Sequence, residues 1–255
     1  MNKNEIFTLW IPNDGDEKLP LLAHLSLKSM VLCGHDVVLY TYHNLENIPE
    51  GVKVLNGNEI LDSSKIFMYK EGHQTYAGFA DLFRLYRLYK YGGTWLDLDV
   101  LLIRNINEKY DDEILICSEP TFRFYLHPNN GLLRFPKGDP LIKYMLDYAE
   151  EMGEDITHGQ TGPRLISNIL KKFPEYNQFL KHFNIYHLFG WKYLNDYSKS
   201  PKKILNKINM NEIIGFHINN TFFEKILTTK NPNGLFEILK KSILNSNTYK
   251  EYFKY

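Results

Sequence analysis

At 255 residues, with 44% hydrophobic and 24% charged residues, the chain has the composition of an ordinary soluble globular protein and the length of one large domain. No segment approaches the roughly 18 uninterrupted apolar residues of a membrane-spanning helix, and the N-terminal stretch lacks the layout of a signal peptide. The formal net charge is zero, and zinc-finger spacing, an RNP motif and an Arg-rich run are absent, so nucleic acid is not an expected partner.

The predicted elements alternate between apolar strands and amphipathic helices. Strands are predicted over residues 5–12, 36–42, 52–55, 94–97, 114–119, 131–135, 184–188 and 213–218. Helices are predicted over about 19–33, 76–91, 139–152, 160–172 and 233–245, with a helical turn at 57–62 and a loop around 127–130. This alternation indicates an α/β fold with a mixed, mostly parallel sheet flanked by helices. Ligands of such sheets bind beyond the carboxyl ends of the strands, near the point where the strand order reverses.

Two carboxylates, Asp97 and Asp99, follow the predicted strand 94–97 inside an apolar, β-prone run. If the strand continues through them, both side chains point to the same side, because strand side chains alternate with period two. Two anions on one face repel each other, and their burial without partners is costly. A divalent cation bound by Asp97 and Asp99 relieves both problems, and oxygen ligands favour Mg2+ or Mn2+. The pattern alone is weak, because Asp14-Gly-Asp16 has the same spacing in a polar turn.

The helix before this strand carries a second pair of charges. Asp81 and Arg84 lie on one helical face, where an ordinary ion pair worth a few tenths of a kcal/mol is the simplest interpretation. The surrounding positions are apolar, so we expect the pair to be half-buried. A buried pair beside a metal site more often serves a ligand than stability.

One string of residues runs from Ala80 through Asp81, Arg84, Leu88, Gly92-Gly93, Trp95 and Asp97 to Asp99. It closely resembles the DXD region of glycosyltransferase family 32. It is also similar to the catalytic domains of large glucosylating toxins. The resemblance implies a GT-A fold, a nucleotide-sugar donor, Mn2+ or Mg2+, and transfer with retention at the anomeric carbon. It implies that Asp81 and Arg84 contact the ribose and sugar of the donor. It assigns Asp97 to ribose or sugar hydroxyls and a metal-bound water, and Asp99 to the metal itself, with Trp95 among the donor-binding residues.

Weaker resemblances lie outside this string. Trp10 matches the end of the family's first strand, where an aromatic residue often lies against the base; a core tryptophan is the alternative. Asn130 lies in Asn129-Asn130-Gly131, which looks like a family loop that binds sugar hydroxyls, and plain turn chemistry remains open. Residues 159–163 (GQTGP) resemble the family's Thr-Gly-Pro helix start, for which a proline near the first helical position is the alternative.

A C-terminal element, His217 to Phe222, resembles the family's His-x-x-x-Ser-Trp, which closes over the diphosphate and the metal. This chain has Thr221 for Ser and Phe222 for Trp. His217 is therefore either a ligand of the metal or diphosphate, or a packed, hydrogen-bonded histidine. Thr221 is a candidate contact of the diphosphate.

We expect one domain over residues 1–255, with a nucleotide-sugar-binding half (1–115) and an acceptor-side half (116–255). The expected reaction is transfer of a hexose or N-acetylhexosamine from a UDP-sugar, or with lower preference a GDP-sugar, to a glycan of a capsule, lipopolysaccharide or other surface polysaccharide. A toxin-like effector that glycosylates a host protein and a silent nucleotide- or carbohydrate-binding module are the alternatives. The intact set of Asp81, Arg84, Asp97 and Asp99 argues against the silent module.

The location of the protein is predicted from its cysteines and its charge distribution. Cys33 and Cys117 lie in apolar contexts typical of buried free thiols, which indicates the cytoplasm. Residues 1–170 hold 16 Lys and Arg against 24 Asp and Glu, whereas residues 171–255, the C-terminal third, hold 14 against 6. This basic third is either a solvated surface or a face for a lipid-linked glycan acceptor and the anionic inner face of the membrane.

Overall fold

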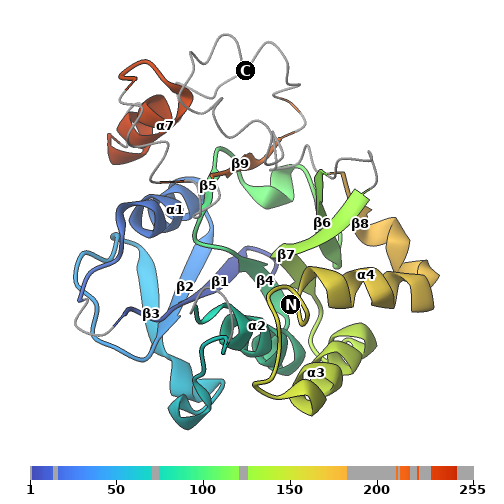
Figure 1. Cartoon of the computed structure of the whole chain (residues 1–255). Coiled ribbons are helices and arrows are strands. Elements are labelled where there is room, and N and C mark those ends of the chain that lie inside the picture. Colours follow the sequence, from blue (N-terminus) through green and yellow to red (C-terminus); the bar gives the residue numbers. More distant parts are fainter. Residues whose placement is uncertain are drawn as a thin grey trace.

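The computed structural model describes residues 2–13, 17–70, 75–120, 126–182, 211, 213–218, 223 and 231–245. Within these ranges the centre of the molecule is a seven-stranded sheet with the order β3-β2-β1-β4-β7-β6-β8 (Figure 1). Its strands are β1 (Glu5–Trp10), β2 (Asp36–Thr41), β3 (Val52–Asn56), β4 (Gly93–Leu96), β6 (Leu115–Pro120), β7 (Leu126–Phe135) and β8 (Leu180–Lys181). β5 (Val100–Leu102) and β9 (Gly215–His217) form a separate antiparallel pair.

The central sheet is mixed. β1, β2, β3 and β4 run parallel, whereas β7 is antiparallel to β4 and β6 is antiparallel to β7. β1 pairs with β2 on one side and with β4 on the other, so the strand order reverses at β1. The predicted α/β sheet is confirmed, and the carboxyl ends of β1 and β4 mark the crevice in which such sheets bind ligands.

Helices cover both faces of the sheet (Figure 1). The described helices are α1 (Leu21–Leu32), α2 (Ala77–Tyr91), α3 (Pro140–Met152), α4 (Pro163–Lys172) and α7 (Leu235–Leu244), with short 3-10 turns at Gly57–Glu59, Ser63–Lys65, Ile106–Glu108 and Pro174–Phe179. On one face, Phe79 and Phe83 of α2 are fully buried in a cluster shared with β1, β4, α3 and α4. On the other face, Leu27 and Met30 of α1 pack against β1 and β2. A third apolar cluster joins α1 and α7 to β5 and β9.

Each predicted helix is present within a few residues of its expected bounds, but the predicted strands and loops need correction at several places. The strand predicted over 94–97 ends at Leu96, before the first of the two carboxylates. The loop predicted around 127–130 is part of β7, where His127, Pro128 and Asn129 pair with β6. The strands β5 and β8 were not predicted, because two or three residues carry too little periodicity to be recognised. The strand predicted over 184–188 lies outside the described residues.

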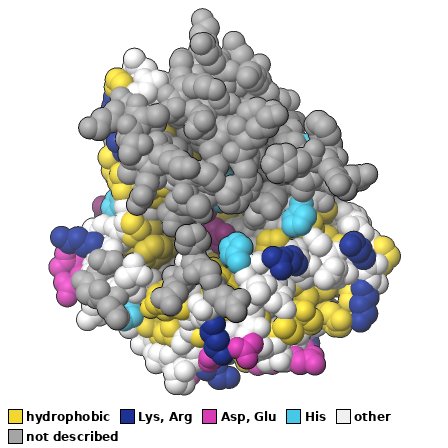
Figure 2. Space-filling view, viewed as in Figure 1, with side chains coloured by type: hydrophobic (Ala, Val, Ile, Leu, Met, Phe, Trp, Pro, Cys, Tyr) yellow, Lys and Arg dark blue, Asp and Glu magenta, His cyan; other side chains and the backbone are white. Residues whose placement is uncertain are grey.

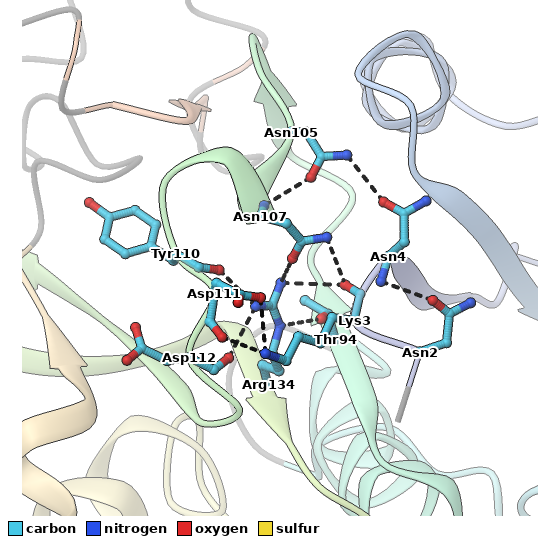
Figure 3. A network of polar contacts seen from close by, with 10 residues as sticks. All are labelled: Asn2, Lys3, Asn4, Thr94, Asn105, Asn107, Tyr110, Asp111, Asp112 and Arg134. Carbon is cyan, nitrogen blue, oxygen red and sulfur yellow. Dashed lines mark hydrogen bonds and ion pairs between the residues drawn. The ribbon is translucent and has the colours of Figure 1, made fainter.

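Arg134 of β7 is fully buried and pairs with Thr94 near the start of β4, at the end of the strand away from the crevice (Figure 3). Its guanidinium donates to Thr94 Oγ1 at 2.9 Å, to the Tyr110 carbonyl at 2.9 Å and to Asn107 Oδ1 at 2.7 Å. Weaker bonds reach the carbonyls of Asp112 and Lys3. One side chain therefore ties β4, β7, the turn after β5 and the N-terminal segment together. Since its acceptors are mostly backbone carbonyls, we assign it to the fold and not to a ligand.

No helix in the described parts of the chain is long and apolar enough to cross a membrane. Cys33 and Cys117 are both free thiols; Cys117 is buried and Cys33 is half-buried.

Candidate active site

The site begins with the way α2 is joined to β4. Gly92 ends α2 with φ of +71°, a conformation that L side chains rarely adopt. A Cβ on Gly92 would lie 2.6 Å from the Lys137 backbone nitrogen, so no side chain fits there. The chain turns sharply into β4 at this point. As a result, Asp81 and Arg84 on the last three turns of α2 lie beside the residues that follow β4.

Asp97, Leu98 and Asp99 form a turn between β4 and β5, and the Val100 amide donates to the Asp97 carbonyl at 3.4 Å. The expectation that both carboxylates follow the alternation of a strand is therefore wrong. Instead the turn sends the two carboxylates to different partners. Asp97 contacts α2 and β4, whereas Asp99 contacts β9.

Arg84 is the centre of the first group of contacts. Its Nη2 lies 3.2 Å from Asp97 Oδ1 and 3.6 Å from Asp81 Oδ1, and its Nη1 donates to the Asn130 carbonyl. The guanidinium carbon lies 4.3 Å from the centroid of the Trp95 ring, and the Trp95 indole nitrogen donates to Asp97 Oδ1 at 2.6 Å. Arg84 is 4% exposed and Asp81 is 7% exposed, so the pair is buried more completely than the half-burial expected from the sequence.

A bulge in β7 places Asn130 beside this group. The pairing of β6 with β7 jumps from Ile116 opposite Leu133 to Cys117 opposite Asn129, so Asn130, Gly131 and Leu132 have no partner on β6. On the other side of β7, the Asp97 amide donates to the Gly131 carbonyl at 2.8 Å. The bulge therefore fixes both the start of the Asp97 turn and the position of Asn130. Asn130 Nδ2 donates to Asp81 Oδ1 at 2.7 Å.

Thr161 completes the surroundings of Asp81, and it was absent from the predicted site residues. Its hydroxyl, in the segment before α4, donates to Asp81 Oδ2 at 3.0 Å. The sequence contained a signal for it, because residues 159–163 resemble a Thr-Gly-Pro helix start. Its direction toward Asp81 depends on the docking of α4 beside β7, which a local pattern does not report.

Asp99 and His217 form the second group. His217 Nε2 lies 3.1 Å from Asp99 Oδ1. Two strand contacts produce this proximity, since Val100 pairs with His217 and the Ile218 amide donates to the Asp99 carbonyl at 2.9 Å. The opposite edge of β5 is held by α1, where Ser26 Oγ donates to the Val100 carbonyl and Ser29 Oγ accepts from the Leu102 amide. β5 is therefore fixed between α1 and β9, with Asp99 at its start.

Electrostatics couple the two groups. Burial raises the pKa of the Asp97 carboxyl, the Arg84 guanidinium lowers it, and the nearby negative charge of Asp99 raises it, with a net increase. Burial also raises the pKa of Asp81, and Arg84, Thr161 and Asn130 act against that increase. The site thus holds two carboxylates, Asp81 and Asp97, beside one buried arginine, with the carboxylate of Asp99 close to Asp97. In the view of Figure 2, acidic, histidine and hydrophobic side chains lie close together near the middle of the molecule.

The remaining predicted residues lie at the edge of this arrangement or outside it. Trp10 ends β1, is partly buried, and packs against the α1 side of the sheet; its indole nitrogen has no hydrogen-bond partner among the described residues. Trp95 is 2% exposed, so within this structure it acts through Arg84 and Asp97. Thr221 lies outside the described residues.

The donor set of Asp99 and His217 suits a divalent cation. Two ligands on an octahedral ion with bonds of about 2.1 Å are separated by about 3 Å when they are neighbours, and the observed separation of the two atoms is 3.1 Å. Among the described residues, no group of three His, Cys, Asp or Glu side chains lies close enough to hold an ion. A cation here therefore needs further ligands from water or from a substrate, as is usual for Mg2+.

The fold is shared with solved glycosyltransferases. The apo form of the glycosyltransferase GlyE in Streptococcus pneumoniae TIGR4 has a TM-score of 0.52 and 14% identity, and the match covers 100% of this chain and 65% of that one. A second GlyE structure has a TM-score of 0.50 and 14% identity, over 99% of this chain and 64% of that one. PaToxG Glycosyltransferase has a TM-score of 0.48 and 14% identity, over 98% and 87%. The chain thus spans slightly less than two thirds of the length of GlyE.

The chain has a GT-A-like glycosyltransferase fold. Residues 23–117 match the family model described as "Glycosyltransferase sugar-binding region containing DXD motif". The resemblance predicted from the sequence is therefore confirmed over this region, which contains Asp81, Arg84, Asp97 and Asp99. Asn130, Thr161 and His217 lie beyond it. Glycosyltransferases with this motif are typically metal-dependent. No curated protein matches the sequence.

Proposed function

We propose that the chain is a metal-dependent, retaining glycosyltransferase that transfers a hexose or an N-acetylhexosamine from a UDP-sugar to a glycan of a surface polysaccharide. The observation that carries this proposal is the joining of Asp81, Arg84 and Asp97 beside the Asp99–His217 pair, at the carboxyl ends of β1 and β4. A nucleotide sugar needs both features, because it presents hydroxyl groups at one end and a charged diphosphate at the other.

Asp99 and His217 would hold the metal, Mn2+ or Mg2+, with the donor diphosphate and water as the other ligands. When bound, the ion neutralises the charge that develops on the nucleoside diphosphate as the glycosidic bond breaks. Asp97 is a weaker candidate ligand, because its Oδ1 already accepts from Trp95 and lies beside Arg84. We therefore assign Asp97 to the ribose or sugar hydroxyls, within reach of a water on the ion.

The protein's own groups bind and orient the donor. The buried Arg84 and Asp81 form the floor of the sugar pocket, where a carboxylate accepts from hydroxyl groups and a guanidinium donates to them. Asn130 lies next to both. Trp10, at the end of β1, has an indole nitrogen without an acceptor among the described residues and is assigned to the nucleotide end of the donor. Thr221 remains the proposed contact of the diphosphate. Retention at the anomeric carbon is proposed from the family resemblance.

The acceptor and the setting follow from weaker arguments. We assign residues 1–115 to the donor and 116–255 to the acceptor within one domain, because the residues proposed for the donor's nucleotide and sugar lie mostly in the first half. The excess of basic residues in the C-terminal third supports an anionic, lipid-linked glycan acceptor at the inner face of the membrane, and hence a cytoplasmic enzyme.

The test is hydrolysis of UDP-sugars and GDP-sugars with Mn2+, followed by replacement of Asp99. Wild-type protein should release the nucleoside diphosphate from at least one donor. Asp99→Asn should lower this rate at least 100-fold, since it removes a charged ligand of the ion. Asp147→Asn, which changes an exposed aspartate paired with Lys143 on α3, is the matched control and should retain the wild-type rate.

Unchanged hydrolysis by Asp99→Asn would remove the metal assignment. Donor binding without hydrolysis, measured as a thermal shift in the wild-type protein, would instead favour the silent binding module. A host protein labelled in preference to any glycan would favour the toxin-like alternative.

A further inference from the structure

The carboxylate of Asp81 is held from three separate elements. Asn130 of β7 donates to its Oδ1 at 2.7 Å, Thr161 donates to its Oδ2 at 3.0 Å, and Arg84 of α2 lies 3.6 Å from Oδ1. Thr161 and Asp81 are both buried. Each carboxylate oxygen has therefore one close donor from the protein, and each keeps capacity to accept a further hydrogen bond.

The segment that carries Thr161 packs closely against Asn130 and Asp81. A Cβ on Gly162 would lie 2.4 Å from Asn130 Nδ2 and 3.0 Å from Asp81 Oδ2, so only glycine lets this backbone reach the carboxylate without moving it. The preceding turn is closed on itself, because the Thr157 amide donates to Gln160 Oε1 and the Arg164 amide donates to the Gly159 carbonyl. Thr161 is thus held in place by its own loop and not by Asp81 alone.

The hydrogen bond from Thr161 has a fixed direction. The Thr161 hydroxyl is the donor of this bond, so its single hydrogen points at Asp81 Oδ2. Without this donor, only Asn130 and Arg84 would orient the carboxylate, and both act on Oδ1. Oδ2 would then be free to turn away from its position. A binding group held in advance loses less freedom when the ligand arrives, and this gain appears as affinity.

We propose that Thr161 is a positioning residue for the donor sugar: its hydroxyl orients Asp81 so that the free capacity of the carboxylate faces the hydroxyl groups of the sugar. This inference rests on the proposed function, because it takes Asp81 as a floor of the sugar pocket. It concerns the sugar end of the donor only. Thr161 has no role in holding the nucleotide or the metal.

The experiment compares UDP with UDP-glucose, or with the UDP-sugar that the hydrolysis screen selects, both in the presence of Mn2+. Thr161→Val removes the hydroxyl and keeps the shape of the side chain. It should raise the Kd and KM for the UDP-sugar about tenfold, as expected for the loss of one hydrogen bond to a charged group, and leave the Kd for UDP unchanged. Thr161→Ser keeps the hydroxyl and should restore the wild-type values.

Two further variants separate positioning from damage to the fold. Thr157 lies in the same loop, and its hydroxyl contacts Gln160 and Arg164. Thr157→Val removes this hydroxyl and should change neither Kd. In an Asp81→Asn background, Thr161→Val should add little to the loss of sugar affinity, because contacts that act through one group are not additive. Thr161→Ala gives a second hydroxyl-free variant if the valine crowds the loop.

If Thr161→Val weakens the binding of UDP and of the UDP-sugar by the same factor, the proposal is overturned. It is also overturned if Thr161→Val leaves the Kd for the UDP-sugar unchanged. Full additivity with Asp81→Asn would overturn it as well. These outcomes differ from failure of the proposed function, in which the wild-type protein neither binds nor hydrolyses any nucleotide sugar.

Discussion

The guanidinium of Arg84 joins groups that the chain brings from α2, β4 and β7, and few other side chains have the geometry to do so. A lysine at this position keeps the charge but presents one compact donor group in place of a planar fork, and it does not stack on Trp95 in the same way. Arg84→Lys should therefore lower donor hydrolysis about 100-fold. Arg84→Met should also destabilise the fold by about 3–5 kcal/mol, because it leaves Asp81 buried without its cation.

Initial rates of UDP-sugar hydrolysis and urea unfolding curves measure the two effects separately. Arg84→Lys is expected to lose activity with a smaller loss of stability than Arg84→Met. Activity of Arg84→Lys within a few fold of wild type would show that charge alone suffices, and the stacked, forked geometry would then have no catalytic role.

His35 provides a pH-dependent prediction away from the site. Its Nε2 accepts from the Ile106 amide at 3.0 Å, so the ring is neutral and its Nδ1 donates to the Asn4 carbonyl. Burial lowers the pKa of His35 to about 4. Because the unfolded chain binds a proton near pH 6.5 and the folded chain does not, stability falls as the pH drops from 6.5 toward 4. The full loss is about 3 kcal/mol.

The measurement is the free energy of unfolding in urea at several pH values, compared with His35→Gln. The glutamine retains a donor and an acceptor but does not titrate, so wild type should lose more stability than the variant across this window. Parallel curves for the two proteins would show that His35 is not the titrating group.

Among single residues, those whose positions agree with the prediction are the ones placed by local spacing. Asp81 and Arg84 share a helical face, and Gly92-Gly93 ends that helix, so the sequence was sufficient to place them beside Asp97. The alternation argument for Asp97 and Asp99 was wrong, because β4 ends at Leu96 and a turn decides where each carboxylate points. Thr161 was missed as a site residue, since only the packing of α4 against β7 directs its hydroxyl at Asp81.

At the scale of elements, Arg134 gives the clearest prediction. It donates to β4, to the turns that follow β5 and to the N-terminal segment; Thr94 is buried with it and the other acceptors are partly buried. Arg134→Lys should destabilise the fold by about 2–4 kcal/mol, because an ammonium cannot reach all of these acceptors and leaves carbonyl groups unsatisfied. The effect should appear in urea unfolding, while the affinity for nucleotide in the folded protein stays close to wild type.

Lys143→Met, at an exposed helical ion pair, is the matched control and should change stability by less than about 0.5 kcal/mol. Equal stability of Arg134→Lys and wild type would show that the carbonyl groups find other donors.

The elements themselves were predicted unevenly for a physical reason. Long helices carry enough apolar periodicity to be recognised, and α2 and α3 lie within two residues of their expected bounds. The bulge in β7 was taken for a loop, because the Pro-Asn-Asn-Gly stretch has turn residues that are held here as a strand by β6 and the Asp97 turn. β5 gains its place from Ser26, Ser29 and β9, which are distant in sequence.

For the whole molecule, the two proposed metal ligands, Asp99 and His217, lie far apart in the sequence. Asp99 follows β4 in the central sheet, whereas His217 lies on β9, whose other contacts are with β5, α1 and α7. An ion bound to both would join the C-terminal part to the sheet only in the folded protein. Ligands that bind the native state alone raise its apparent stability by about 2.7 kcal/mol at 100 times the Kd. For a chain of this size we expect Mn2+ with UDP to raise the Tm by roughly 5–10 °C.

Removal of the ion with EDTA should reverse the shift, and His217→Gln should abolish most of it, because the glutamine amide is a poorer ligand than imidazole. His24→Gln is the matched control: His24 is hydrogen-bonded to the Asn47 carbonyl on the far side of α1, a bond that a glutamine amide can also make. It should keep the full shift. The measured quantity is the difference, for each variant, between the Tm with Mn2+ and the Tm without it. An equal shift in His217→Gln and wild type would mean that the ion is held without His217, and the link between the C-terminal part and the sheet would then rest on the pairing of β5 with β9 and on apolar packing.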